Sequence, residues 1–239
     1  MTVRPSLPWL ALIGLIAVGC GEPLTSNKAE DSLPDPSSTV AEAPATDSAP
    51  TAAAPEPAVD TTIIPGERLG PITRQTSRDQ LANLFGEENL EDTQVDVGEG
   101  LTESGTNITL ANGETISVLW TDASQSDVLE VRQLGPQWQT PEGIHVGMSL
   151  EELKSVAGSF EILGFGWDYG GTVLLDNSQV DQYANDLILR LAVDDASAKS
   201  QAYQTLIGDT PYPSTDSRFN EMDAYVDEMI VVLTPYGEF

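Results

Sequence analysis

The sequence predicts an α+β fold in which two tandem helix-plus-antiparallel-sheet repeats form one domain, with the helices packed on one face of the sheet. Two observations predict it. An amphipathic helix pattern occurs twice at a constant offset, and a series of short strand patterns follows each copy. We expect the first repeat at residues 61–141 and the second at residues 142–239. A chain of 239 residues also has room for accessory segments before this domain.

The helix pattern lies in "GPITRQTSRDQLANLFG" (70–86) and again in "EGIHVGMSLEELKSVAG" (142–158). Ser77 falls on Ser149, and both are N-cap candidates followed by a carboxylate in the first turn. Leu at the fourth position after each cap, and Leu or Val at the seventh, form one apolar stripe, and a Gly ends each pattern. Each repeat therefore opens with a short amphipathic helix.

Strand patterns follow each helix. In the first repeat they are "TQVDVGEG", "TNITL", "ETISVLWT" and "DVLEVRQL", and in the second "FEILGFGWDY", "GTVLL", "DLILRLAVDD" and "YVDEMIVVLTP". Asn112-Gly113 between two of them is typical of a type I′ hairpin turn. Strands joined by short turns pair as antiparallel neighbours, so a sheet is expected in each repeat.

The run "GIHVGMSLEELKSVAG" and its weaker copy "GPITRQTSRDQLANLFG" resemble the opening of the repeat in β-lactamase inhibitor protein and in the small lipoproteins of the outer-membrane assembly machine. The stretch from "WQTPEGIHVGMSLEEL" through "GFGWDYGGTV" also resembles bacterial exported proteins that carry a domain of unknown function. The resemblance implies the duplicated α+β fold. It carries over no functional residue, because no inhibitory or assembly-contact motif is present.

Residues 1–19 have the pattern of a signal peptide: Arg4, an apolar run too short to span a membrane, and small residues at the end. The run closes with Ala17-Val18-Gly19-Cys20, which resembles the lipobox of bacterial lipoproteins. That resemblance implies cleavage before Cys20 and lipidation of its thiol. The protein would then be lipid-anchored to the cell membrane or outer membrane, facing the periplasm or the exterior. The alternative is an ordinary secretory signal in which Cys20 is incidental.

Residues 20–60 are rich in Pro, Ala, Ser and acidic side chains and lack apolar periodicity, which predicts a disordered tether. The whole chain has 38 Asp plus Glu against 10 Lys plus Arg, a formal net charge of −28. Such a charge argues against nucleic acid as a partner, since Lys and Arg supply most of the affinity for phosphates. The single cysteine excludes an intramolecular disulfide and a cysteine metal cluster.

Sequence motifs for chemistry are few. His145 is the only histidine, which rules out a two-histidine zinc site, and no nucleophile elbow lies near it. Residues 96–100 and 176–182 contain carboxylates but lack the ligand pattern of an EF-hand loop. We therefore expect no catalytic residue, no metal and no cofactor.

The most distinctive run is "GFGWDYGG", residues 164–171. If it continues a strand, period-2 alternation places Phe165, Trp167 and Tyr169 on one face. These rings form either core beneath the helices or an aromatic recognition surface on the open face of the sheet, with Trp120 or Trp138 near it.

We expect a membrane-anchored envelope lipoprotein that acts as a non-enzymatic binding or structural module and recognises an envelope protein or polymer on its sheet face. The alternative is an envelope enzyme or enzyme inhibitor of unknown target that uses surface carboxylates. The lack of catalytic motifs in the sequence favours the first.

Overall fold

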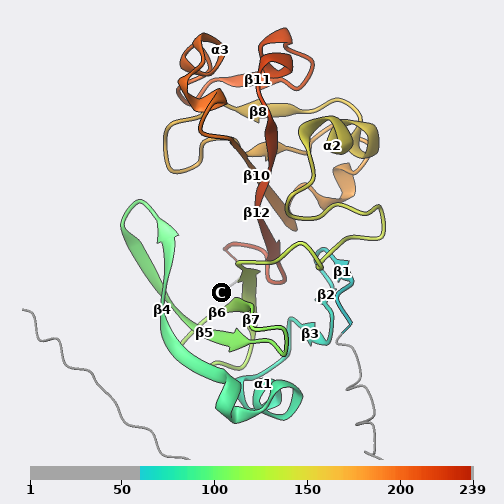
Figure 1. The fold of residues 1–239 in the computed structure, drawn as a ribbon. Helices are drawn as coiled ribbons and strands as arrows, with labels where there is room; N and C mark the ends of the chain where they lie inside the picture. The colour runs from blue at the N-terminus through green and yellow to red at the C-terminus, as the bar shows by residue number, and fades with distance from the viewer. Residues whose placement is uncertain (1–59, 238–239) are drawn as a thin grey trace, which may run out of the picture. The chain divides into compact units, whose positions relative to one another are not determined.

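A computed structural model describes residues 60–237 of the chain. These residues form a mixed α+β structure made mostly of antiparallel sheets, with three α-helices in the described part (Figure 1). This confirms the predicted α+β class and the predicted antiparallel strand pairing. The predicted signal peptide, Cys20 and almost all of the predicted tether lie outside the described residues. Within residues 60–237, no helix is both long and apolar enough to cross a membrane.

The α-helices are α1 (Arg78–Phe85), α2 (Leu150–Ala157) and α3 (Gln201–Gln204), and the 3-10 helices are η1 (Glu87–Asn89), η2 (Asp181–Tyr183), η3 (Ser197–Lys199) and η4 (Ser217–Glu221). The longer strands are β4 (Leu90–Gly98), β5 (Leu101–Thr109), β6 (Thr115–Trp120), β7 (Val128–Arg132), β10 (Leu187–Val193) and β12 (Ala224–Val232). The short strands are β1 (Ile63–Ile64), β2 (Arg68–Leu69), β3 (Ile72–Thr73), β8 (Glu161–Leu163), β9 (Val173–Leu174) and β11 (Pro211–Pro213).

The six longer strands form the central sheet, in the order β10-β12-β7-β6-β5-β4, and every neighbouring pair is antiparallel. The strands β11-β8-β9 form a smaller sheet, and a bridge between Thr172 and Arg190 joins its inner end to β10. A third small sheet, β1-β2-β3, precedes α1. In the described chain the outermost strands are therefore β4 at one end and β11 at the other.

Both predicted helix starts are confirmed. Ser77 and Ser149 each accept a hydrogen bond from the backbone N–H three residues on, and the side chain at that position, Gln80 or Glu152, bonds back to the cap N–H. This capping box satisfies two backbone donors that the first turn of a helix leaves free. α2 ends at the C-cap residue Gly158, whose backbone N–H donates to the carbonyl of Lys154. The N-cap serine and the apolar residues that follow it at helical spacing therefore predicted where each helix starts.

The hairpin between β5 and β6 forms where it was predicted, but the predicted type I′ turn is wrong. Only Gly113 has a positive φ, of 85°, whereas a type I′ turn needs positive φ at both central residues. Its N–H donates to Leu110, whose own N–H donates to Glu114, so the loop has three residues. The side chain of Asn112 accepts from the N–H of Glu114, which provides a local bond that a type I′ turn does not require.

The central sheet has two different faces. Paired residues along one row, Val118, Val131, Val231 and Leu187, belong to the main hydrophobic core together with Leu81 of α1 and Leu153 of α2. We call this side the helix face. Because neighbouring residues in a strand point to opposite sides, Leu119, Glu130 and Val232 lie on the other side, which we call the cleft face. The functional candidates lie on that side.

Candidate functional site

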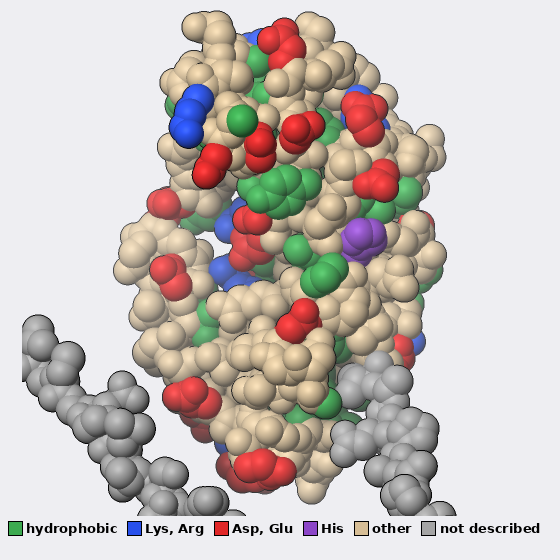
Figure 2. Space-filling model, in the orientation of Figure 1, with side chains coloured by type: hydrophobic (Ala, Val, Ile, Leu, Met, Phe, Trp, Pro, Cys, Tyr) green, Lys and Arg blue, Asp and Glu red, His purple; other side chains and the backbone are tan. Residues whose placement is uncertain are grey.

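The cleft face of the sheet contains a cleft with a volume of about 440 Å³. We call it the sheet-face cleft; it is lined by Val97, Arg132, Leu163, Trp167, Tyr169, Thr172, Ile188, Arg190 and Tyr236. A smaller neighbouring hollow of about 270 Å³ shares Val97, Arg132 and Tyr236 with it. Figure 2 shows a hollow on one side of the molecule with Lys or Arg side chains in it beside Asp or Glu. Strands from both halves of the sequence, β4, β7 and β10, therefore contribute to one site.

Trp167 and Tyr169 meet at the sheet-face cleft. The indole N–H of Trp167 donates to the carbonyl of Gly164 at 2.8 Å, which ties the ring back to its own turn. The two rings pack edge to face, with centroids 5.4 Å apart and planes at 75°. Trp167 is nevertheless 39% exposed, so part of this fixed ring stays open to solvent.

Phe165 lies elsewhere, because the predicted strand through residues 160–169 is wrong. Strand β8 ends at Leu163, and the chain then turns, with Gly166 at a φ of 83°. The turn breaks the period-2 alternation, which holds only in extended chain. Phe165 is 4% exposed, stacks on Tyr203 and contacts Phe219 edge-on, so it belongs to the core.

Trp120 and Trp138 also belong to the core. Trp120 borders the smaller hollow but is 6% exposed, and its indole N–H donates to Thr106 at 3.0 Å on the helix face. Trp138 is fully buried, and its Nε1 has no hydrogen-bond partner within residues 60–237. Of the predicted surface residues, Trp167 and Tyr169 line the sheet-face cleft, whereas Phe165, Trp120 and Trp138 do not.

The two arginines that line the cleft are held in ion pairs. On β7, the Nε of Arg132 donates to the carboxylate of Glu130, a side chain that is only 2% exposed. On β10, Nη1 of Arg190 donates to Glu228 of β12 at 2.8 Å. The guanidinium carbon of Arg190 lies 5.5 Å from the ring centroid of Tyr169, a cation–π contact. The buried Nε of Arg190 has no hydrogen-bond partner in the described chain.

Tyr236 reaches the cleft from the C-terminal segment. The backbone N–H groups of Leu233 and Thr234 both donate to the carbonyl of Leu129, which holds this segment against β7. The hydroxyl of Tyr236 donates to the carboxylate of Glu130. Burial of the hydroxyl, followed by the neighbouring negative charge of Glu130, raises the pKa of Tyr236 well above its usual range. Tyr236 therefore remains a neutral hydrogen-bond donor.

Sequence reasoning did not identify Arg132, Arg190 or Tyr236 as site residues. One signal was present: in "VLEVR", Glu130 and Arg132 are two residues apart in a strand and so share a face of the sheet. No comparable signal links Arg190 to Glu228 or Tyr236 to Glu130, because these partners are 38 and 106 residues apart.

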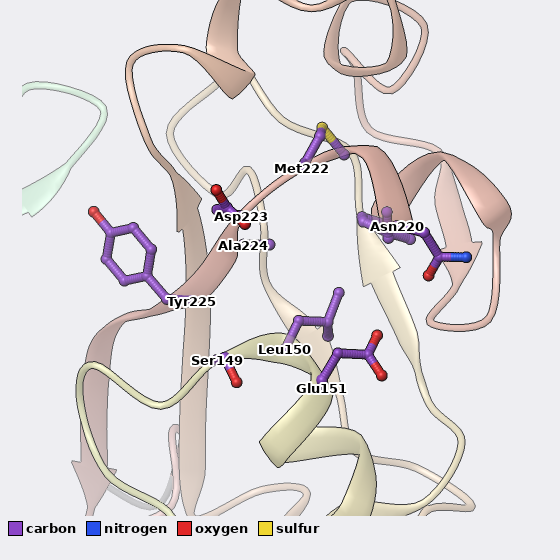
Figure 3. A pocket seen from close by; sticks show the side chains of 9 residues that line it. Ser149, Leu150, Glu151, Asn220, Met222, Asp223, Ala224 and Tyr225 are labelled. Atoms are coloured by element: carbon purple, nitrogen blue, oxygen red, sulfur yellow. The ribbon is translucent and has the colours of Figure 1, made fainter.

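A second hollow, with a volume of about 380 Å³, lies at the start of α2 beside the beginning of β12 (Figure 3). In Figure 3 the carboxylates of Glu151 and Asp223 point to opposite sides of Leu150, so they do not form an acid–base pair across the hollow. The carboxylate of Glu151 bonds instead to Lys154 at 2.5 Å. This arrangement offers no reactive centre.

The carboxylate-bearing segments 96–100 and 176–182 were not predicted to bind a metal. Within residues 60–237, no group of three or more His, Cys, Asp or Glu side chains is placed to hold a metal ion. His145 is partly buried, and its Nδ1 lies 2.9 Å from the carbonyl of Val146. The sheet-face cleft is therefore the strongest candidate site in the described residues.

Comparisons of the chain with protein-family models, curated proteins and solved structures found no match. The class that the structure defines is thus a mixed α+β protein with a cleft on one face of its central sheet.

Proposed function

We propose that this chain is a lipid-anchored lipoprotein of the cell envelope, and that its sheet-face cleft binds an envelope component without chemical conversion. The anchor is supported by the sequence Ala17-Val18-Gly19-Cys20 at the end of an apolar run. The binding role is supported chiefly by Trp167, a large ring held in a fixed orientation and still 39% exposed. Exposed aromatic rings beside charged groups are frequent contact points in binding sites.

We also infer that the fold arose from two tandem α+β repeats. The capping boxes at Ser77 and Ser149 support this, as does a backbone hydrogen bond from a later strand to the segment that precedes each cap. The N–H of Val128 at the start of β7 donates to the carbonyl of Arg74, three residues before the first cap. The N–H of Val226 near the start of β12 donates to the carbonyl of Met148, just before the second cap. β7 and β12, the last long strand of each half, then pair with each other.

Metabolic labelling tests the anchor. Cells that express the chain are grown with a radioactive or clickable fatty acid, and the label is followed in the wild type and in Cys20→Ala. We expect label in the wild type and none in the variant. Equal labelling of both proteins would rule out Cys20 as the lipid-bearing residue.

Site-specific cross-linking tests the cleft. A photoreactive amino acid replaces Tyr169 in the cleft or, as a control, Leu84, which is 49% exposed on α1. We expect an adduct in living cells from position 169 that is lost in Arg190→Gln, and no such adduct from position 84. Adducts from position 84 alone, or the same adduct from both positions, would contradict a binding role for the cleft.

A further inference from the structure

We propose that the ligand of the sheet-face cleft is an uncharged glycan segment, with one sugar ring lying on the exposed face of Trp167. This inference rests on the proposed function, because it specifies the ligand class of that same site.

The charges in and around the cleft disfavour ionic ligands of either sign. Arg132 is paired with Glu130, and Arg190 is paired with Glu228, so the positive charges are already compensated. An anion would approach a protein whose formal net charge is −28. A cation would meet two arginines, whereas the carboxylates paired with them do not line the cleft. A neutral ligand avoids both repulsions.

The groups that line the cleft suit a ligand rich in hydroxyl groups. Arg132 and Arg190 line it with guanidinium groups that donate, and the hydroxyl-bearing side chains Tyr169, Thr172 and Tyr236 also line it. A sugar presents several adjacent hydroxyls, each of which can donate and accept, so it can bond to these groups while both ion pairs stay intact.

Trp167 suits the apolar side of a sugar ring. Its only polar atom is occupied by the bond to Gly164, and the edge-to-face contact with Tyr169 fixes the tilt of the ring. The exposed part of the side chain is therefore apolar aromatic surface. The C–H groups on one side of a pyranose ring form a flat apolar patch that can pack on such a surface, and little rotamer freedom would be lost on binding.

Peptide binding fits the cleft less well. An extended peptide usually binds a sheet by adding a strand at an edge, where backbone N–H and C=O groups are free. The sheet-face cleft lies on a face of the sheet, where β7 and β10 pair with their neighbours through their backbones, and the outermost strand β4 contributes only Val97 to the lining. Its volume of about 440 Å³ falls in the range of sites for small ligands and short oligomer segments.

Calorimetric titration of the purified full-length chain in detergent tests the proposal. The probes are uncharged tetrasaccharides of glucose and of N-acetylglucosamine, an anionic tetragalacturonate, and a neutral blocked Ser/Gly tetrapeptide. We expect saturable binding of at least one uncharged tetrasaccharide, and weaker binding of the anionic glycan and of the peptide. Binding of neither uncharged glycan, or tighter binding of the anion or the peptide, would overturn the proposal.

Variants then place the bound sugar. Trp167→Ala should weaken the affinity at least about tenfold, and Arg190→Gln should weaken it as well. Leu84→Ala removes an apolar side chain of similar exposure on α1 and should leave the affinity unchanged. Thermal unfolding of each variant shows whether it is folded, and Trp167→Phe, which keeps an aromatic ring, should retain part of the affinity. Equal affinities for Trp167→Ala and Leu84→Ala would refute stacking on Trp167.

The glycan inference and the proposed function can fail separately. If cross-linking at position 169 gives an adduct dependent on Arg190 but the uncharged tetrasaccharides do not bind, the cleft is a binding site for another ligand. If neither experiment gives a signal, the proposed binding function itself is wrong.

Discussion

The hydroxyl of Tyr236 donates a hydrogen bond to the carboxylate of Glu130, a partner 106 residues earlier in the chain. Glu130 also accepts from Nε of Arg132, so one buried carboxylate joins β7 to the C-terminal segment. Unpaired, this charge would be costly to bury away from water. The two contacts therefore stabilise both the sheet and the wall of the cleft.

Tyr236→Phe should lower the free energy of unfolding by about 0.5–1.5 kcal/mol, because the bond is to a charged group but Tyr236 is 56% exposed, so water competes for its hydroxyl. Urea unfolding followed by circular dichroism measures the change. Tyr225→Phe is the matched control, because the Tyr225 hydroxyl forms no hydrogen bond within residues 60–237, and it should change stability little. An equal loss in both variants would mean that the bond to Glu130 contributes nothing specific.

Arg132→Leu should cost more, about 3–5 kcal/mol, because it leaves Glu130 buried without its cation. Replacing both residues, in Glu130→Leu/Arg132→Leu, removes the stranded charge and should recover part of the loss. The comparison is a double-mutant cycle measured by urea unfolding. If the double variant is less stable than Arg132→Leu alone, the two side chains do not act as a compensated pair.

Asp186→Asn should stabilise the protein at pH 7 by up to about 0.5 kcal/mol, since the side chain is partly exposed. Burial raises the pKa of the Asp186 carboxyl above its ordinary value of 3.8. The folded state therefore holds the proton more tightly than the unfolded state. The free energy of unfolding falls as the pH rises from 3.8, the ordinary pKa, through the raised pKa of the folded state. The gain in Asp186→Asn should be full at pH 7 and vanish near pH 3.

Thermal unfolding at several pH values checks this prediction. Asp227→Asn, at an exposed position on β12, serves as the control and should show no such pH-dependent gain. A gain in Asp186→Asn that persists unchanged at pH 3 would have to come from something other than the carboxylate charge.

Gly171→Ala should lower the free energy of unfolding by more than about 2 kcal/mol, through backbone strain and a steric clash. Gly171 has a φ of 75°, and a Cβ there would lie 2.1 Å from the carbonyl oxygen of Leu191 on β10. Gly143→Ala is the control. Gly143 has a φ of 86°, but a Cβ there would have no atom within 4 Å apart from its chain neighbours, so this variant should show the backbone strain alone, about 1–2 kcal/mol. Chemical denaturation of both variants separates the two effects, and equal losses would exclude the clash.

Features set by local sequence were predictable. The caps at Ser77 and Ser149, the helices after them and the hairpin at Gly113 depend on residues within a few positions of one another, and each is present. The mixed α+β class follows from these patterns together.

Features set by distant or strained contacts were not predictable. The turn after Leu163 depends on Gly166 and on backbone bonds from Phe165 and Gly208, and it separates Phe165 from Trp167. Residues that are close in sequence therefore serve different roles, one in the core and one in the cleft. The ion pair between Arg190 of β10 and Glu228 of β12 depends on strand order, which alternation of residues within one strand does not determine.

The two outermost strands of the described chain differ in how they stop further growth of the sheet. β11 has Pro211 and Pro213 at its two ends, and proline has no N–H to offer an incoming strand. β4 carries Glu91 and Asp96, whose negative charges repel a second copy of itself, whereas Asp92 is paired with Arg78 of α1. Copies of this protein crowded together should therefore stay separate and not stack into fibrils, whatever holds them in place.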